Sequence, residues 1–385
     1  MRKVAIVGVG MTVFGKFPGK TIEELGASAV RDALADAGMS PKDIQTAYCG
    51  NLTESKYSGH VSTLTQSILK LNGINRIPMM RVEDACASGS CAVRECWMAV
   101  ASGLYDIALA LGVEKLTAQG QAPLTSVGHN VEGLCGMNPV SEWALRAKRY
   151  MHEYGITPAQ LARISVKNHG NGCLNPRSQF HKATTVAEVL ASAMVSDPLT
   201  VLSACPITDG GAAAILCSEE AARRFTTKPV YLAASELTSG EYSQPRDVTY
   251  HELEERAGRA AYERAGLGPE DLDFAELHDC FTIAEMIRAE SLGICKRGEY
   301  ARLLDEGRWD LDGAFPVNAS GGLLSKGHPV GATGVAQVAE LTWQLRDEVQ
   351  ERSRQIKGAR AGLGHCSGGV VGDDTGACSV IIVKK

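Results

Sequence analysis

Short apolar runs alternate with amphipathic segments along most of the chain. The runs Val4–Val9, Thr46–Gly50 and Ile107–Val113 predict buried strands. Between them, apolar residues recur at helical spacing over Ile22–Ala37 and Val61–Leu69. This alternation is typical of an α/β protein, and we expect a mostly parallel sheet that is covered by helices on both faces.

The same order of elements returns in the second half of the chain. The predicted strands are Thr208–Cys217, Val230–Glu236, Phe274–Leu277 and Val380–Val383. The predicted helices are Tyr250–Ala265, Ile283–Leu292 and Gly334–Leu345. From the order of elements we infer an internal duplication of one α/β unit.

A stretch rich in Asn, Gln, His, Pro and Gly interrupts the first half. It runs from about residue 116 to 202 and contains predicted helices at Glu142–Tyr154 and Pro158–Asn168. We interpret it as an inserted loop or substrate domain. The predicted division is therefore an N-terminal half of residues 1–115 and 203–228, the insertion 116–202, and a C-terminal half of residues 229–385.

Composition narrows the class of protein. The chain has 385 residues, of which 44% are hydrophobic and 22% charged, and its net charge is −5, so nucleic acid is not an expected partner. Its first apolar run is too short for a signal peptide or a membrane span, which indicates a cytoplasmic protein. Its 12 cysteines are then expected to be reduced, most of them as small core residues.

Cys86 is the first candidate for chemistry. It precedes a run of small residues, Ala87–Ser102, that predicts a helix. Unpaired backbone N–H groups and the positive end of the helix dipole favour a thiolate at such a position. A buried structural cysteine is the alternative, and this segment alone does not separate the two.

His328 lies in the most informative segment, from Asn318 to Gly334. These 17 residues include five glycines and predict a surface or cleft loop that exposes the ring of His328 between Gly327 and Pro329. A histidine held in a loop suits a general base, although a solvated loop histidine is the plainer alternative.

Two further segments carry candidate groups. His278 and Cys280 follow the predicted strand Phe274–Leu277, and His278 there can donate a hydrogen bond to an oxyanion. Cys366 lies in a glycine-rich segment with Gly368, whose backbone N–H can face a ligand. A histidine at the sheet edge and a tight turn before the last strand are the respective structural alternatives.

In this order, these segments resemble the thiolase family over nearly the whole chain. Ala85-Cys86-Ala87-Ser88-Gly89 resembles the motif of the acylated cysteine. Asn318–Gly334 resembles the Asn-x-x-Gly-Gly and Gly-His-Pro loop, and Cys366-Ser367-Gly368 resembles the Cys-x-Gly motif. The resemblance implies two similar βαβαβαββ halves in a five-layered α-β-α-β-α arrangement with an inserted loop domain.

The resemblance also implies roles. Cys86 is the expected nucleophile and His328 its base, while Asn318, Gly327 and Gly368 are expected around the substrate and its oxyanions. The expected substrates are CoA thioesters, with coenzyme A as acyl acceptor. No metal and no tightly bound cofactor is expected.

One motif departs from many thiolases. His278-Asp279-Cys280-Phe281 replaces Asn-Glu-Ala-Phe and resembles the sterol-carrier-protein-x, or lipid-transfer, branch. There the cysteine of this motif is often credited with the acid/base role, so Cys280 and Cys366 both remain candidates. We favour Cys366, because the apolar helix after Cys280 predicts burial of that thiol and a raised pKa.

The branch also suggests partners. Some bacterial and archaeal members, such as acetoacetyl-CoA and benzoylsuccinyl-CoA thiolases, work with a small zinc-binding OB-fold subunit, and this sequence lacks such a module. A homodimer or a dimer of dimers is expected. A ketoacyl synthase, a retro-aldolase on the same scaffold and a non-catalytic lipid-carrier subunit are the alternatives.

Overall fold

A nine-stranded sheet is the framework of the computed structural model, which describes residues 1–385 except 54–61, 118–130, 227, 243–246 and 372–373. Its strand order is β3-β2-β4-β7-β1-β8-β11-β10-β9. The strands are β1 (Val4–Met11), β2 (Thr46–Gly50), β3 (Met79–Val82), β4 (Ile107–Lys115), β7 (Asp209–Ser218), β8 (Val230–Thr238), β9 (Phe274–Glu276), β10 (Ala361–Val371) and β11 (Asp374–Lys384).

The sheet is mixed, so the expectation of a mostly parallel sheet is wrong. The pairs β2/β3, β2/β4 and β9/β10 are parallel. The pairs β1/β7, β1/β8, β4/β7, β8/β11 and β10/β11 are antiparallel. Strands that are apolar on both faces indicate helices on both faces, but they do not fix strand direction. After β4, the long segment up to β7 lets the chain return antiparallel beside it.

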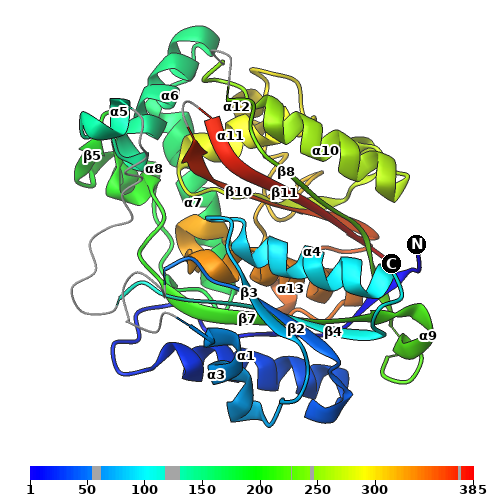
Figure 1. The fold of residues 1–385 in the computed structure, drawn as a ribbon. Coiled ribbons are helices and arrows are strands. Elements are labelled where there is room, and N and C mark those ends of the chain that lie inside the picture. Colours follow the sequence, from blue (N-terminus) through cyan, green and yellow to red (C-terminus); the bar gives the residue numbers. More distant parts are fainter. Residues whose placement is uncertain (54–61, 118–130, 227, 243–246, 372–373) are drawn as a thin grey trace.

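Helices cover both outer faces of the sheet and also lie between its two parts. Those that lie against the sheet are α1 (Ile22–Ala37), α3 (Leu64–Leu69), α4 (Ser88–Ala101), α10 (Glu252–Ala265), α11 (Thr282–Ser291) and α13 (Val330–Arg346). The sheet bends where β1 meets β8, because only two residue pairs join these strands. Figure 1 shows α4 and α13 between the two parts of the sheet, with α1 and α3 on one outer side and α10 and α11 on the other. These are the five layers that the resemblance implies.

The middle layer is thin because the residues that face it are small. On β4 the side chains that pack toward α1 are large, and those that pack toward α4 and α13 are small: Ile107, Leu109, Leu111 and Val113 against Ala108 and Ala110. The two central helices also touch at glycines. A Cβ added at Gly89 of α4 would lie 2.6 Å from the carbonyl oxygen of Gly331 in α13. Any larger residue there would separate the two helices.

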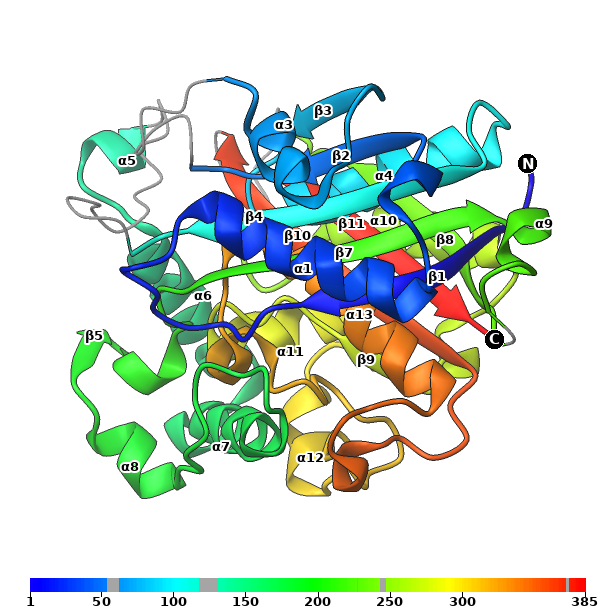
Figure 2. The ribbon, with the colours of Figure 1, turned by 90° about the horizontal axis from the view of Figure 1, so that it is seen from below.

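The segment predicted as an insertion forms a helical group at one side of the molecule. It contains α5 (Val131–Leu134), α6 (Pro139–Tyr154), α7 (Pro158–Leu174), α8 (Val186–Ala191) and the short pair β5 (Met194–Ser196) and β6 (Leu199–Thr200). Figures 1 and 2 both show this group beside the sheet, away from α9 (Glu219–Ala222). Within the described ranges, the helices are all too short or too polar to cross a membrane.

The predicted elements agree with the structure in position more than in length. The helix Ile22–Ala37 has the predicted bounds, and Gly38 ends it in the left-handed conformation. The predicted helix Val61–Leu69 begins only at Leu64, and Val61 lies outside the described residues. Strands β3 and β10 and helix α12 (Tyr300–Asp305) were not predicted.

Candidate active site

Cys86 lies in a tight turn just before α4. The turn is closed by Ala87 N–H, which donates to Asp84 O over 2.9 Å, and by Ser88 Oγ, which donates to Ala85 O over 2.6 Å. Ala85 adopts a positive φ of 48°, which is unusual for a residue other than glycine. Cys86 therefore lies immediately before the first turn of α4, which begins at Ser88.

His328 lies at the start of the other central helix, and it is buried. A surface or cleft loop that exposes His328 was expected, and the exposure is what proves wrong: Asn318 is 0% exposed and His328 only 6%. Gly322–Lys326 forms a wide π-helical turn, and α13 begins at Val330. The glycines allow close packing of backbone on backbone, as where Gly331 touches β2 and β4, rather than mobility.

The contact between α4 and α13 brings these two groups together with a third. Cys86 Sγ and one ring nitrogen each of His278 and His328 all lie within 4.8 Å of one another. The two imidazole rings meet edge to face, with their centroids 4.9 Å apart. Residues from positions 86, 278 and 328 thus form one cluster at the meeting point of the two halves.

Thr333 fixes the hydrogen position on His328. Its hydroxyl lies 2.7 Å from His328 Nδ1 and donates to Pro329 O over 3.1 Å. Because the hydroxyl hydrogen is used there, Nδ1–H must be the donor to Thr333 Oγ1. Nε2 then presents a lone pair, which is what a base for the thiol requires.

Ser367 fixes the opposite tautomer on His278. The backbone N–H of Ser367 donates to His278 Nδ1 over 3.2 Å, so Nδ1 carries no hydrogen and Nε2 does. The ring therefore presents an N–H donor. Cys366 lies beside it, with Sγ 3.2 Å from His278 Nδ1 and 2.8 Å from Cys86 O.

Cys280 is the less enclosed of the two remaining thiols. Cys366 is 0% exposed, whereas Cys280 is half-buried. Arg288 of α11 donates from Nη1 to Cys280 Sγ over 3.7 Å. The expected burial of Cys280 and the rise of its pKa are both present. The guanidinium of Arg288, which the helix after Cys280 also turns toward the thiol, was not expected.

Burial sets the resting protonation of the cluster. It raises the pKa of Cys86 to about 12 and lowers the pKa of His328 to about 3. Burial also lowers the pKa of His278 well below its ordinary value and raises that of Cys366 well above. The thiols and imidazoles are thus neutral at rest. Desolvation outweighs the helix dipole that was expected to favour a thiolate at Cys86.

Asn318 and Gly327 belong to the frame behind the cluster. The side-chain oxygen of Asn318 accepts from Leu277 N–H over 2.8 Å, and its nitrogen donates to Glu285 over 2.7 Å. Gly327 has a φ of 108°, and a Cβ there would lie 2.8 Å from the side chain of Thr208. Both residues hold the chain in place, and the side chain of Asn318 is committed to partners other than the three clustered groups.

Gly368 lies directly against the nucleophile candidate. It belongs to β10, and a Cβ added to it would lie 2.7 Å from Cys86 Cβ and 2.8 Å from Cys86 Sγ. Real Cβ atoms do not approach so closely, so only glycine fits beside the thiol.

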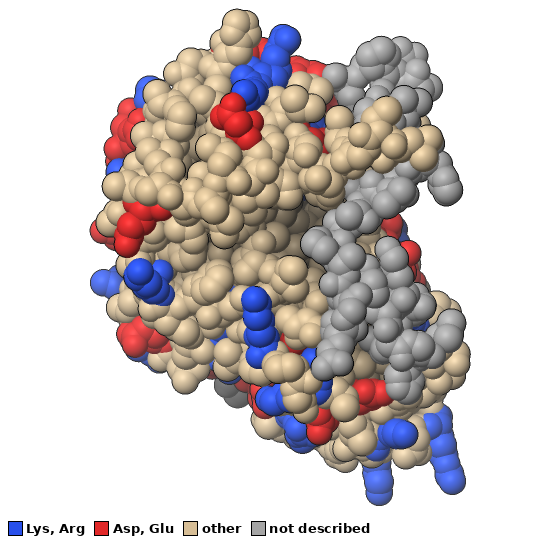
Figure 3. Space-filling view, turned by 90° about the vertical axis from the view of Figure 1, so that its left-hand side faces the viewer, with Lys and Arg blue, Asp and Glu red and all other residues tan. Residues whose placement is uncertain are grey.

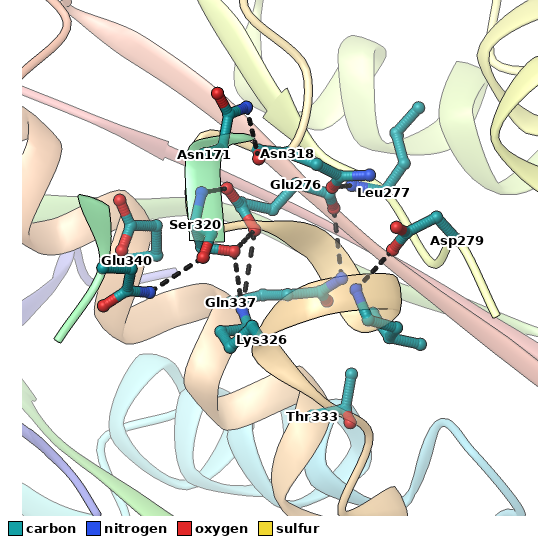
Figure 4. A network of polar contacts seen from close by, with 12 residues as sticks. Asn171, Glu276, Leu277, Asp279, Asn318, Ser320, Lys326, Thr333, Gln337 and Glu340 are labelled. Atoms are coloured by element: carbon teal, nitrogen blue, oxygen red, sulfur yellow. Dashed lines mark hydrogen bonds and ion pairs between the residues drawn. The ribbon is translucent and has the colours of Figure 1, made fainter. Parts of the chain in front are cut away.

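A buried polar network supports the loop around Asn318. Figure 4 shows Ser320 and Lys326 converging on Glu276. Ser320 N–H donates to Glu276 over 2.9 Å, and Lys326 Nζ lies 2.8 Å from Ser320 Oγ and 3.6 Å from Glu276. Asp279 holds the next turn by accepting from Leu323 N–H over 2.6 Å. A loop tied in this way has little freedom to move His328.

Several residues of the site were not predicted from the sequence. They are Glu254, Arg288, Thr333 and Ser367. The available signal was in α11, where Glu285 and Arg288 lie among Ile283, Met286 and Ile287 and are nonetheless buried. A charged residue on the buried face of a helix indicates a partner or a function.

Comparisons with known proteins identify the family. Residues 4–220 match the family model described as "Thiolase, N-terminal domain", and residues 234–381 match "Thiolase C-terminal domain-like". The chain is 43% identical over 379 residues to an acetyl-CoA acetyltransferase of Methanothermobacter thermautotrophicus, covering 97% of this chain and 98% of that protein.

Two other relatives differ in their named roles. Benzoylsuccinyl-CoA thiolase subunit BbsB of Thauera aromatica is 39% identical, over 90% of this chain and 90% of that protein. Sterol carrier protein 2 of Gallus gallus is 37% identical, over 94% of this chain and 69% of that protein. Among solved structures, the Ltp2-ChsH2(DUF35) aldolase matches with a TM-score of 0.82 and 25% identity, over 98% of this chain and 97% of that one.

Proposed function

This chain belongs to the thiolase family, in the branch that includes sterol carrier protein 2, and from that premise we propose that it acts through an acyl-Cys86 intermediate. Its activity is that of a thiolase, an acyltransferase that cleaves or forms a 3-oxoacyl-CoA. The observation that carries the proposal is the cluster of Cys86, His278 and His328 within 4.8 Å.

The first half-reaction forms the acyl-enzyme. His328 Nε2 takes the proton of Cys86, and the thiolate attacks the 3-oxo carbon of the substrate. The His278 N–H donates to the oxyanion that develops on the attacked carbonyl. The N-termini of α4 and α13 add the positive ends of two helix dipoles to the same place. The resting pKa values disfavour transfer of the Cys86 proton to His328. The oxyanion donor and the helix dipoles offset this cost, because they stabilise the negative charge that develops.

The second half-reaction needs a proton and a new thiol. Cleavage of the C–C bond leaves acyl-Cys86 and the enolate of the shorter CoA thioester. A cysteine thiol protonates the α-carbon of that enolate, and free coenzyme A then takes the acyl group. Gly368, which touches Cys86 Sγ, leaves room for the carbonyl oxygen of the acyl-enzyme near the backbone N–H groups. We propose no resident metal or redox cofactor for these steps.

The thiol that moves the α-proton is either Cys366 or Cys280. Cys366 has the Cys-x-Gly motif and contacts both Cys86 and His278. Cys280 has the half-buried position and the adjacent guanidinium of Arg288. Both thiols are therefore proposed to adjoin the substrate, with different electrostatic surroundings.

A retro-aldolase is the second candidate, favoured by the structural likeness to the Ltp2-ChsH2(DUF35) aldolase. Such a reaction needs no acylated cysteine, so Cys86 separates the two functions. Intact-protein mass spectrometry after addition of acetoacetyl-CoA should show a mass increase of one acetyl group, located at Cys86 by peptide mapping. The variant Cys86→Ala should remain unmodified and inactive, whereas Cys173→Ser, at a half-buried thiol in α7, should be acylated normally. Absence of acylation together with aldol cleavage would overturn the proposal.

We also propose a partner subunit and a homodimer. The relative BbsB is named a subunit, and the structural relative is named as Ltp2-ChsH2(DUF35), which supports a partner subunit here. That the partner is a small zinc-binding OB-fold chain is what the resemblance to the branch implies. Figure 3 shows that the face beside α5, α6 and β5 carries few charges and is hollowed near its centre. The exposed apolar residues of this region include Leu134, Leu145, Leu190, Met194, Val195, Val201 and Ile207.

Purification from the native source tests the assembly. We expect a zinc-containing small chain to co-purify and light scattering to give at least a dimer. A chain that remains monomeric, fully active and zinc-free would contradict both proposals. The cytoplasmic location remains a prediction. The same holds for the division into an N-terminal half (1–115 and 203–228), an insertion (116–202) and a C-terminal half (229–385).

A further inference from the structure

A buried ion pair lies directly behind the cluster. Arg288 of α11 and Glu254 of α10 are 2% and 0% exposed. Arg288 Nε lies 3.2 Å from Glu254 Oε1. A buried pair of this kind is costly to desolvate and contributes little net stability, so its presence beside reactive thiols calls for a functional explanation.

Arg288 reaches the segment that carries His278 and Cys280. Its Nη1 donates to the backbone carbonyl of His278 and also to Cys280 Sγ, 3.7 Å away. The guanidinium packs 5.0 Å above the ring of Trp143. Arg288 is thus held on three sides, and its charge is directed at the thiol of Cys280.

Glu254 reaches the strand that carries Cys366. It accepts from Ser367 Oγ over 3.0 Å, and His251 Nδ1 lies 3.1 Å away and His365 Nε2 3.5 Å away. The ion pair therefore ties the Cys280 segment to the Cys366 strand, and it places its cation at the Cys280 end.

The surroundings of the two thiols differ accordingly. Burial raises the pKa of Cys280, and the cation and hydrogen bond of Arg288 oppose that increase. Burial raises the pKa of Cys366 well above its ordinary value, and the neighbouring Cys86 thiol adds to the increase. The charge of Arg288 also opposes this increase, but its hydrogen bond goes to Cys280 and not to Cys366. Other titratable or charged groups also bear on Cys280 or on its cation: Cys86, Cys205, His251, Glu254, His278, Asp279, His328, His365, Cys366 and Cys378.

We propose that Arg288, held by Glu254, is a positioning residue that favours negative charge on Cys280 and so selects Cys280 over Cys366 as the thiol that moves the α-proton. The inference rests on the proposed thiolase mechanism. In cleavage, the Cys280 S–H bond breaks, its proton goes to the α-carbon of the enolate, and the remaining thiolate faces the guanidinium. In synthesis the same thiolate takes the proton back. Cys366 instead donates to the carbonyl of Cys86.

The test measures the two half-reactions separately in the full-length chain. Exchange of the α-hydrogens of acetyl-CoA with deuterated water reports the α-proton thiol, and single-turnover acylation from acetyl-CoA reports Cys86. In Arg288→Gln, exchange at neutral pH should fall about tenfold or more and recover as pH rises, because one unit of thiol pKa is about tenfold in thiolate. Acylation should change much less. Arg288→Lys should restore part of the exchange.

A direct titration accompanies the kinetics. In a Cys86→Ala background, alkylation of Cys280 by iodoacetamide, resolved by peptide mass spectrometry, should shift to higher pH by about one unit in Arg288→Gln. Cys173, whose pKa burial alone raises, serves as the internal reference and should not shift. Arg354→Gln is the matched control, because Arg354 is also 2% exposed and pairs with a buried carboxylate, Glu340, about 15 Å along α13 from His328.

The outcomes are distinct. An unchanged Cys280 titration in Arg288→Gln, or equal loss of exchange and acylation in the Arg288 and Arg354 variants, would overturn the proposal. If Arg288→Gln does not fold, Cys280→Ser and Cys366→Ser decide: loss of exchange only in Cys280→Ser supports the selection, and loss in Cys366→Ser overturns it. Failure of the mechanism itself would show differently, as no acylation of Cys86 in the unsubstituted chain.

Discussion

The reaction centre has two sides that are built by different means. Cys86 and His328 lie at the starts of two helices, α4 and α13, which touch at Gly89 and Gly331. His278 follows a strand, and Cys366 lies within one. The helix side is positioned by close approach of backbone to backbone, whereas the strand side is positioned by buried polar side chains.

The difference suggests what each side tolerates. Backbone contact at glycine leaves no space for a new atom, so the helix side should be sensitive to added volume. The strand side depends on hydrogen bonds and on one cation, so it should be sensitive to lost charge and to pH. The following predictions test this contrast.

The largest effect is expected from the nucleophile. Cys86→Ala should abolish both acylation and thiolysis, because Cys86 carries the thiol that clusters with the ring nitrogens of His278 and His328. Cys366→Ser should retain acylation of Cys86, because forming the acyl-enzyme from acetyl-CoA requires no α-proton transfer. Rapid-quench mass spectrometry measures both variants. Full thiolysis in Cys86→Ala would remove this residue from the mechanism.

The two histidines should differ in their pH dependence. His328→Ala should slow acylation roughly 100-fold or more at neutral pH, and the rate should rise with pH, because hydroxide then forms the thiolate of a cysteine with a pKa of about 12. His278→Ala should also slow acylation, through loss of an oxyanion donor, but without recovery at high pH. Single-turnover acylation rates from about pH 6 to about pH 10 measure this difference between the two variants. Identical profiles would mean that the two roles are not separate.

Added volume on the strand that faces Cys86 gives the next effect. Gly368→Ala puts a Cβ 2.7 Å from Cys86 Cβ and should slow acylation by roughly tenfold or more, as displaced reacting groups do. Gly364→Ala is the matched control on the same strand, because its Cβ would meet its nearest neighbour, Leu341, at an ordinary 3.4 Å. Equal rates in the two variants would show that Gly368 is not confined by the thiol.

The smallest effect concerns stability. Burial lowers the folded-state pKa of His328 from 6.5 to about 3, so between these values the unfolded chain binds the additional proton. Stability from this group is fully present above pH 6.5 and is lost as pH falls toward 3. The melting temperature should therefore fall with pH in this window, and less steeply in His328→Asn. His181→Asn, at an exposed histidine, should leave the slope unchanged.

Much of the framework could be predicted from the sequence because it depends on local patterns. The helix Ile22–Ala37 carries its periodicity and its terminal glycine within one segment. Strand direction was not predictable in this way, because β1 and β4 pair with β7 across long separations. Order and location of elements are local information, and pairing is not.

The residues of the site show the same difference between local and long-range information. Motifs identified Cys86, His278, His328 and Cys366, and the fold brings these four together. The glycines of Asn318–Gly334 suggested an exposed loop, because sequence cannot distinguish a glycine that gives freedom from one that permits contact. Arg288 was missed because its ion-pair partner, Glu254, lies 34 residues before it in another helix, so no local pattern joins the two.

The origin of the groups around Cys86 in distant segments has a consequence for the folding of the chain. The groups that surround Cys86 come from segments far along the chain: His278 follows β9, His328 precedes α13, and Cys366 and Gly368 belong to β10. Until β10 adds to the sheet, the thiol lacks Gly368 and Cys366 beside it. A chain in which β10 has not joined the sheet therefore holds Cys86 without these two neighbours, and we expect the reactivity of Cys86 toward thioesters to depend on that pairing.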